Sequence, residues 1–258
     1  MPDLTGLAWS LLAVAAVIVG ISKTGIPGAG TIAVAIFAAV LPARASTGTI
    51  LLLLIVADVF AVIAYRRHAN WRALWRLVPA VAVGILLGVA FLAVADDLWV
   101  KRIIGVILVG VIAITLWRRR RVAPALGGEE RAPAAEASMA RNRVAAGVYG
   151  TLGGFTTMVA NAAGPVMSMY FLAARFPVKE FLGTAAWFFA IVNVSKVPFS
   201  IGLGLITVPS LLLDLVLVPA VVVGAVLGRW IAARVDQLLF ERLVIAFTIV
   251  GAAYLLLS

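Results

Sequence analysis

Ten apolar segments, each ended by charged residues or by Gly and Pro, fill most of this 258-residue chain. In the first half they cover roughly residues 7–22, 26–41, 46–65, 75–95 and 98–117, and in the second half roughly 143–159, 162–174, 181–200, 208–233 and 238–257. The last three of each half approach the roughly 20 residues that a helix needs to cross a bilayer, whereas the first two are shorter. The sequence therefore predicts an all-α polytopic membrane protein, in which each half is a broken or re-entrant helix pair followed by three transmembrane helices.

The composition agrees with a membrane protein. Hydrophobic residues make up 64% of the chain and charged residues 12%, which is too apolar for a soluble domain of this length. The net charge of +10 comes from Lys and Arg that gather in short loops, so it indicates membrane topology and not a nucleic-acid partner. The chain has no cysteine, which excludes thiolate chemistry, and we expect neither a cofactor nor a metal site.

The two halves are related by an internal repeat. Gly, Pro and polar positions recur in one order at offsets of 134, 135 and 140: Gly30 with Gly164, Pro42 with Pro177, Gly48 with Gly183, Asp58 with Asn193, and residues 77–84 with 217–224. Chance similarity between apolar stretches would reproduce Leu and Val but not these positions. The sequence therefore predicts a first repeat over residues 1–117, a flexible linker over 118–142 and a second repeat over 143–258.

Loop charges predict how the halves are oriented. Four arginines lie between residues 66 and 76, and four more form the run 118–121, so both connections should be cytoplasmic. The connection at 201–210, which corresponds to the first of these in the second half, carries no charge and should face outside. The sequence thus predicts inverted repeats, a cytoplasmic linker and both termini outside.

The first two segments of each half are interrupted in corresponding places. The first break covers residues 20–30 and the second covers 158–165, and each inserts Gly, Pro and polar side chains into an apolar run. In hydrocarbon such breaks are tolerated only where they are buried in protein or line a wet cavity. Paired breaks in inverted repeats indicate a substrate site near the middle of the membrane. We expect half-helices to start near Ile26 and Ala162, with their positive dipole ends facing an anion.

Residues around these breaks are the candidate substrate-binding groups. The glycines would let backbone N–H groups approach a ligand without Cβ crowding, and Lys23 supplies a positive charge unless it is only an interfacial anchor. The candidates are Ser22, Lys23, Thr24, Gly25 and Gly28 at the first break, and Thr157, Asn161 and Gly164 at the second.

Four ionisable residues lie within apolar segments: Lys23, Asp58, Lys196 and Asp214. Such residues are costly at the membrane centre, so an interior or functional position is the default interpretation. Lys196 shares a helix face with Asn193, and it either belongs to the substrate site or extends to the interface. Asp58, whose repeat partner is Asn193, either couples transport to protons or forms a structural ion pair with a lysine. Asp214 lies near the outer end of its segment, where we expect a solvated interfacial charge.

Four motifs follow one another along the two halves: Gly20-Ile-Ser-Lys-Thr-Gly-Ile-Pro-Gly, Gly154-Phe-Thr-Thr-Met, Asn161-Ala-Ala-Gly-Pro165 and Phe188-Phe-Ala-Ile-Val-Asn-Val-Ser-Lys-Val-Pro198. Together they resemble the TauE/SafE family of sulfite exporters and related anion transporters. The resemblance implies a multi-pass permease of the bacterial cytoplasmic membrane that moves sulfite, sulfonates or other organosulfur anions without ATP hydrolysis. It adds Pro27, Pro165, Asn193 and Lys196 to the candidate positions. One departure is Ala163, where related sequences often have Gly.

The sequence therefore predicts a secondary transporter of small anions that works by alternating access around a site near the membrane midplane. An anion channel and a non-transporting membrane scaffold are the alternatives. An enzyme is not expected, because the chain lacks Cys and places its single His in a loop, so a nucleophile with a base or a set of metal ligands is missing. The expected partners are a small anion, with protons as a possible coupling ion, and membrane lipid; the sequence indicates no oligomeric state.

Overall fold

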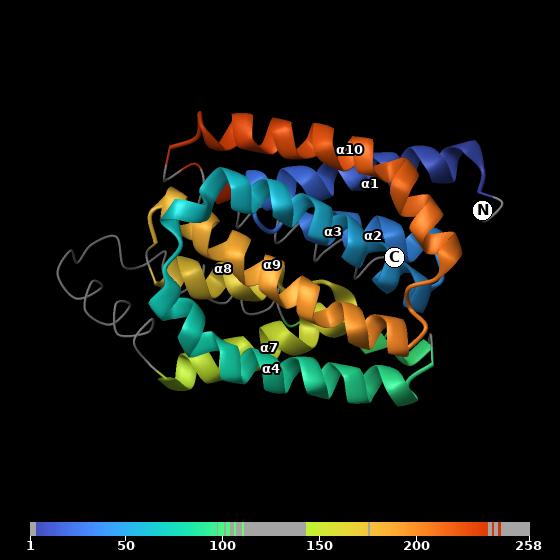
Figure 1. Ribbon diagram of the computed structural model, residues 1–258, viewed down its shortest axis with the longest axis horizontal. Coiled ribbons are helices and arrows are strands. Elements are labelled where there is room, and N and C mark those ends of the chain that lie inside the picture. Colours follow the sequence, from blue (N-terminus) through green and yellow to red (C-terminus); the bar gives the residue numbers. More distant parts are fainter. Residues whose placement is uncertain are drawn as a thin grey trace.

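The computed structural model describes residues 4–96, 98–100, 102, 103, 106, 110, 143–174, 176–236, 239, 242 and 243. The elements of this part of the chain are α1 (Gly6–Thr24), α2 (Gly30–Val40), α3 (Ala43–Tyr65), η1 (Arg66–His68), α4 (Trp71–Val94), α7 (Arg143–Ala160), α8 (Ala163–Ala173), α9 (Val178–Gly202) and α10 (Val208–Ala232) (Figure 1). The predicted all-α fold is confirmed. The predicted fifth helix of each half, at 98–117 and 238–257, and the predicted linker at 118–142 lie largely or wholly outside the described residues.

Helix length separates spanning helices from short ones. Five described helices are long and apolar enough to cross a membrane: α1, α3 extended by η1, α4, α9 and α10. In contrast, α2 and α8 have 11 residues each, which is about 16 Å of helix and half of the hydrocarbon thickness. These features make the chain a multi-pass membrane protein.

The expectation that the first segment of each broken pair is short is wrong for α1. This helix has 19 residues, because Ser22, Lys23 and Thr24 continue it and do not interrupt it, whereas α7 at Arg143–Ala160 agrees with the segment expected at 143–159. The short helix α8 begins at Ala163, which confirms the start expected near Ala162, whereas α2 begins at Gly30, four residues after the start expected near Ile26. The delay in the first break follows from the turn at residues 25–29, which has to be completed before α2 starts.

Two outer helix pairs, α1 with α10 and α4 with α7, pack so closely that their backbones touch at glycine (Figure 1). A Cβ added to Gly20 would collide with the carbonyl oxygen of Val221, and one added to Gly154 would collide with that of Val81. Small residues of this kind allow the close helix contacts that hold bundles together in membranes. The two contacts are related by the sequence offsets of 134 and 140, so both outer pairs use the same packing device.

The helices α3 and α9 run antiparallel through the centre, between the two outer pairs (Figure 1). Their contacts proceed from Gly48 beside Leu205 at one end, through the hydrogen bond between Asn193 and Asp58, to Trp187 Nε1, which donates to the Arg66 carbonyl at the other end. This central pair holds the polar residues discussed below.

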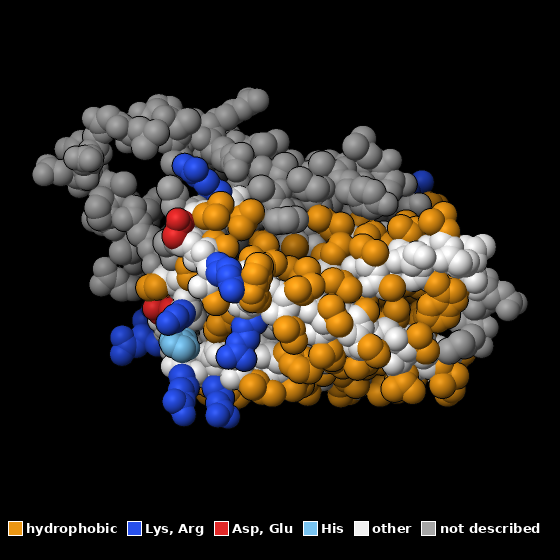
Figure 2. All heavy atoms as spheres, turned by 90° about the horizontal axis from the view of Figure 1, so that it is seen from above, with side chains coloured by type: hydrophobic (Ala, Val, Ile, Leu, Met, Phe, Trp, Pro, Cys, Tyr) orange, Lys and Arg blue, Asp and Glu red, His pale blue; other side chains and the backbone are white. Residues whose placement is uncertain are grey.

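One end of the bundle is basic. We call it the basic end and define it by the exposed residues Arg66, Arg67, Arg72 and Arg76 around the connection from α3 to α4. Figure 2 shows Lys and Arg gathered there with the single His of the chain, while the rest of the described surface in that view is largely hydrophobic. A wide apolar surface beside a basic end fits a protein that exposes its sides to hydrocarbon.

Candidate functional site

The last residue of α1 is Thr24, and its side chain contacts α10. The Thr24 hydroxyl donates to the carbonyl oxygens of Gly20 (3.1 Å) and Ala225 (2.7 Å). The Thr24 carbonyl accepts a hydrogen bond from the Tyr65 hydroxyl at 2.7 Å, which satisfies one of the free carbonyls at the helix end. Thr24 therefore anchors the end of α1 between α3 and α10.

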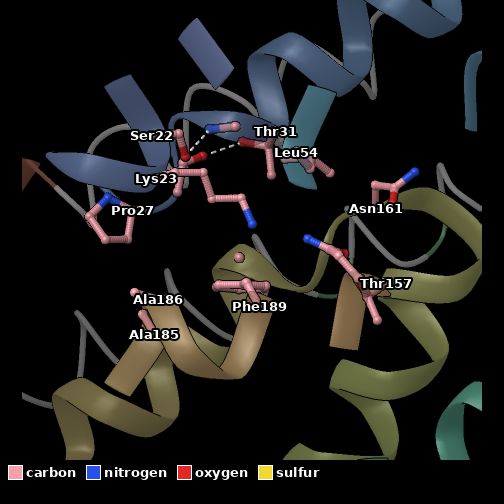
Figure 3. Close-up of a pocket in the computed structure, with 14 residues that line it drawn as sticks. Ser22, Lys23, Pro27, Thr31, Leu54, Thr157, Asn161, Ala185, Ala186 and Phe189 are labelled. Atoms are coloured by element: carbon pink, nitrogen blue, oxygen red, sulfur yellow. Dashed lines mark hydrogen bonds between the residues drawn. The ribbon is translucent and has the colours of Figure 1, made fainter. Parts of the chain in front are cut away.

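The first break is a turn whose backbone needs glycine. Gly28 has a φ of 100°, in the left-handed region that side chains with a Cβ rarely adopt. The Ser22 hydroxyl accepts a hydrogen bond from the Gly30 N–H at 2.9 Å, and the Thr31 hydroxyl donates to the Gly28 carbonyl at 2.7 Å (Figure 3). Both side chains thus fix the turn that leads into α2.

The second break turns at Asn161, which has a φ of 52°. Asparagine tolerates the left-handed region better than most residues with a Cβ. Its side-chain Nδ2 donates to the Thr47 carbonyl at 2.9 Å, so α3 holds the side chain in place. The backbone N–H of Ala162 donates to the Thr156 carbonyl at 3.2 Å and closes the end of α7.

The two breaks meet face to face. A Cβ built on Gly164 would lie 3.9 Å from the backbone nitrogen of Gly28, so the two glycines leave room between the breaks. A cavity of about 40 Å³ lies there, which is enough for a few water molecules or one small anion. Its lining residues are Ser22, Lys23, Pro27, Gly28, Gly30, Thr31, Leu54, Thr157, Asn161, Gly164, Ala185, Ala186, Phe189 and Asn193.

Lys23 extends into this cavity from α1 (Figure 3). Its Nζ lies 2.8 Å from Asp58 Oδ1 and 4.0 Å from the centre of the Phe189 ring. The other oxygen of Asp58 accepts a hydrogen bond from Asn193 Nδ2 at 2.6 Å. Lys23 is therefore stabilised by a carboxylate on α3 and by an aromatic face on α9.

Lys196 lies behind the cavity wall and points toward the second break. Its Nζ donates to Asn161 Oδ1 at 2.6 Å, to Thr157 Oγ1 at 3.1 Å and to Asn193 Oδ1 at 3.3 Å. The residue is 1% exposed, so the alternative that it extends to the interface is wrong. All three of these acceptors are neutral.

The buried cluster holds two lysines and one acid. Lys23 pairs with Asp58, Lys196 donates to neutral acceptors, and Asn193 bridges the two lysines by donating to Asp58 and accepting from Lys196. Buried charge without compensation is costly, so this arrangement favours a bound anion.

The structure brings together most of the residues predicted for the site. Eight of them line the cavity: Ser22, Lys23, Pro27, Gly28, Thr157, Asn161, Gly164 and Asn193. Lys196 and Asp58 contact these lining residues from behind. Thr24 and Gly25 do not line the cavity, because Thr24 bonds to α10 and a Cβ on Gly25 would collide with the carbonyl of Gly228. Gly25 therefore serves helix packing and not ligand approach.

The lining residues that the sequence analysis missed include two that contact site groups or fix the break, Phe189 and Thr31, besides Leu54, Ala185 and Ala186. Phe189 lies within the last of the four motifs, and four residues, about one helical turn, separate it from Asn193. This spacing could have indicated a shared helix face. Thr31 carried no such signal, since its role depends on the turn at Gly28.

The expectation of a solvated interfacial charge at Asp214 is wrong. Asp214 is 5% exposed and lies on the face of α10 that packs inside the bundle. Its position near the end of an apolar run indicated depth in the membrane but not which face of the helix it occupies.

A membrane-spanning helical bundle in which two broken helices meet at a buried charged cavity has the architecture of a secondary transport protein. The family model described as Sulfite exporter TauE/SafE matches residues 12–255, nearly the whole chain, and the chain belongs to this family. The resemblance carried by the four motifs is thereby confirmed, and membership of this family makes the protein a membrane transporter. Neither a curated protein nor a solved structure matches the chain significantly.

Proposed function

We propose that this protein is a secondary transporter that carries a small anion, of the sulfite or organosulfonate class, through the cavity between the two helix breaks. The observation that supports this most directly is that two buried lysines, Lys23 and Lys196, lie at the cavity with one acid, Asp58. An anion in the cavity would restore neutrality, whereas a cation would add to the repulsion.

The size of the cavity favours a compact ligand. A volume of about 40 Å³ accommodates a small oxyanion, and organosulfonates with longer chains would require the cavity to widen. Lys23 and Asn161 lie on different sides of this space (Figure 3), so an anion between them would be held by both repeats. Gly30 and Gly164 lie in the first turns of α2 and α8, where the helix dipole favours negative charge.

Asp58 is the group through which protons could be coupled to transport. While it is ionised, Asp58 neutralises Lys23. Protonation would release the full charge of Lys23 to an anion, so binding of a proton and binding of an anion would favour each other. In this proposal Asp58 is the partner of Lys23 while no substrate is bound, and the substrate anion takes the place of Asp58.

Alternating access would follow from the arrangement of the two halves as inverted repeats. The outer pairs α1 with α10 and α4 with α7 are each joined by close backbone contacts, and they lie on either side of the central pair. Motion of these units against one another around the cavity would open it to one side and then the other. The basic end would face the cytoplasm.

Flux of sulfite into proteoliposomes tests the proposal. Wild-type protein is expected to give uptake that saturates with sulfite concentration and that a proton gradient can drive uphill. Lys23→Ala should reduce this uptake at least about tenfold, since a buried charge contact is lost. Lys179→Ala, which removes an exposed lysine from the same helix as Lys196, is the matched control and should transport normally.

Two results would contradict the proposal. Uptake that rises linearly with concentration and runs only downhill would identify a channel. Normal, saturable uptake by Lys23→Ala would exclude the cavity as the substrate site.

A further inference from the structure

Asp214 is a buried acid that the transport site does not use. It is 5% exposed, and neither of its carboxylate oxygens has a hydrogen-bond partner in the described part of the chain. The contrast with Asp58 is clear, because Asp58 is paired with Lys23 and accepts from Asn193. Asp214 lies six residues into α10, about 9 Å from the start of the helix.

The surroundings of Asp214 are apolar. Leu217 and Val221, which follow it on the same face of α10, belong to a buried cluster with Leu12 of α1 and Leu53 of α3. The helix α10 packs along α1 and also contacts α3. Asp214 thus occupies a position inside the bundle at which a hydrophobic residue would be expected.

Charged and titratable groups on the helices around Asp214 are engaged elsewhere. On α1 and α3, Lys23 pairs with Asp58, and the Tyr65 hydroxyl donates to the Thr24 carbonyl. Arg44 at the start of α3 donates to the carbonyls of Leu92 and Ala95 at the end of α4. On α10 itself, Arg229 lies fifteen residues further on, about 22 Å along the helix.

The equivalent position in the first repeat shows that packing does not require an acid. At the offset of 140 residues, Asp214 corresponds to Leu74 of α4, which is also 5% exposed and lies in the matching apolar cluster. An ionised carboxylate without a partner in such surroundings is expensive, and a carboxyl group there takes up a proton instead.

We propose that Asp214 is a proton-binding site, separate from the Asp58 cluster, which holds a proton in the conformation described here. The O–H bond forms when a hydronium ion gives its proton to the carboxylate and becomes water, and it breaks again when a water molecule reaches the carboxyl group and accepts the proton. Because the side chain is buried and α10 packs against α1 and α3, this exchange requires the contact between these helices to loosen. The inference does not depend on the identity of the transported anion.

Infrared spectroscopy of the protein in lipid vesicles at neutral pH tests this site directly. We expect the carbonyl-stretch band of a protonated carboxylic acid in the wild type and its loss or clear decrease in Asp214→Asn. Asp96→Asn is the control, because Asp96 is exposed and accepts from the Trp99 N–H, and it should leave the band unchanged. No such band, or a band that Asp214→Asn leaves unchanged, would overturn the proposal.

A second variant keeps the test decisive if Asp214→Asn folds poorly. Asp214→Leu introduces the residue found at the equivalent position of the first repeat. A neutral acid contributes no ion pair, so Asp214→Leu should unfold at the same temperature as the wild type or at a higher one, without the infrared band. A clear fall in Tm would show that an ionised Asp214 makes a stabilising contact, and would also overturn the proposal.

Discussion

Lys23 and Asp58 form a buried ion pair, with 2.8 Å between Nζ and Oδ1, that ties the first helix break to the middle of α3. The pair leaves Lys196 without a carboxylate among its described hydrogen-bond acceptors. Removing one partner of a buried pair is expected to cost more than removing both. Asp58→Leu should therefore lower the free energy of unfolding by about 3 kcal/mol or more.

The double variant Lys23→Met with Asp58→Leu should recover most of that stability. Chemical denaturation of the purified protein in detergent measures both changes. Equal stability of the single and the double variant would show that the pair contributes little. Transport should stay low in the double variant, since the ammonium group in the cavity is gone.

The pH dependence of transport is expected to arise from Asp58. Asp58→Asn keeps the shape of the side chain but cannot bind or release a proton. We predict that sulfite uptake varies with pH in the wild type and is nearly independent of pH in Asp58→Asn. Uptake in proteoliposomes across a pH series provides the measurement, and an unchanged profile would remove Asp58 from proton coupling.

Asn161 should respond differently to two small substitutions. Its φ of 52° costs a residue with a Cβ more than it costs glycine, so Asn161→Ala should be less stable than Asn161→Gly by about 1 kcal/mol. Both variants lose the shortest hydrogen bond of Lys196, and both should transport poorly. Thermal unfolding separates the backbone effect from the loss of activity. If the two variants are equally stable, the left-handed conformation at residue 161 is not a constraint.

The glycine contacts of the outer helix pairs should be intolerant of even one methyl group. Gly154→Ala places a Cβ against the Val81 carbonyl and is expected to lower Tm. Gly147 lies on the same helix with no heavy atom within 4 Å of an added Cβ, so Gly147→Ala should be neutral or should stabilise by up to about 1 kcal/mol. A similar Tm for the two variants would contradict the close packing of α4 and α7.

Phe189 is expected to hold the Lys23 ammonium in place through its ring. A cation over an aromatic face at 4.0 Å contributes about 0.5–2 kcal/mol, so Phe189→Leu should weaken sulfite binding several-fold. Phe189→Tyr should keep the affinity, because the ring is retained. Phe199→Leu, at a 37% exposed position on the same helix, is the control. Equal affinities in Phe189→Leu and the wild type would show that the ring only fills space.

The sequence predicted where helices lie more reliably than which faces meet. The segment expected at 208–233 is α10 at 208–232, because turn residues and charges mark helix ends directly. Turn residues and charges do not predict the contacts of Lys196, Thr24 and Asp214. The groups that a side chain contacts depend on neighbouring helices that are distant in sequence. The Lys23 site could be found, because Gly and Pro have few other roles inside an apolar run.

Calorimetry of sulfite binding to the purified protein tests most directly whether the cluster of Lys23, Lys196 and Asp58 is an anion site. Lys196→Met leaves Lys23 and Asp58 as a neutral pair, so we predict that sulfite binding falls at least about thirtyfold, the loss expected when a buried charge loses its partner. Lys179→Met, at an exposed position on the same helix, should bind sulfite as the wild type does. Unchanged sulfite affinity in Lys196→Met would contradict the claim that the two lysines and one carboxylate form an anion site.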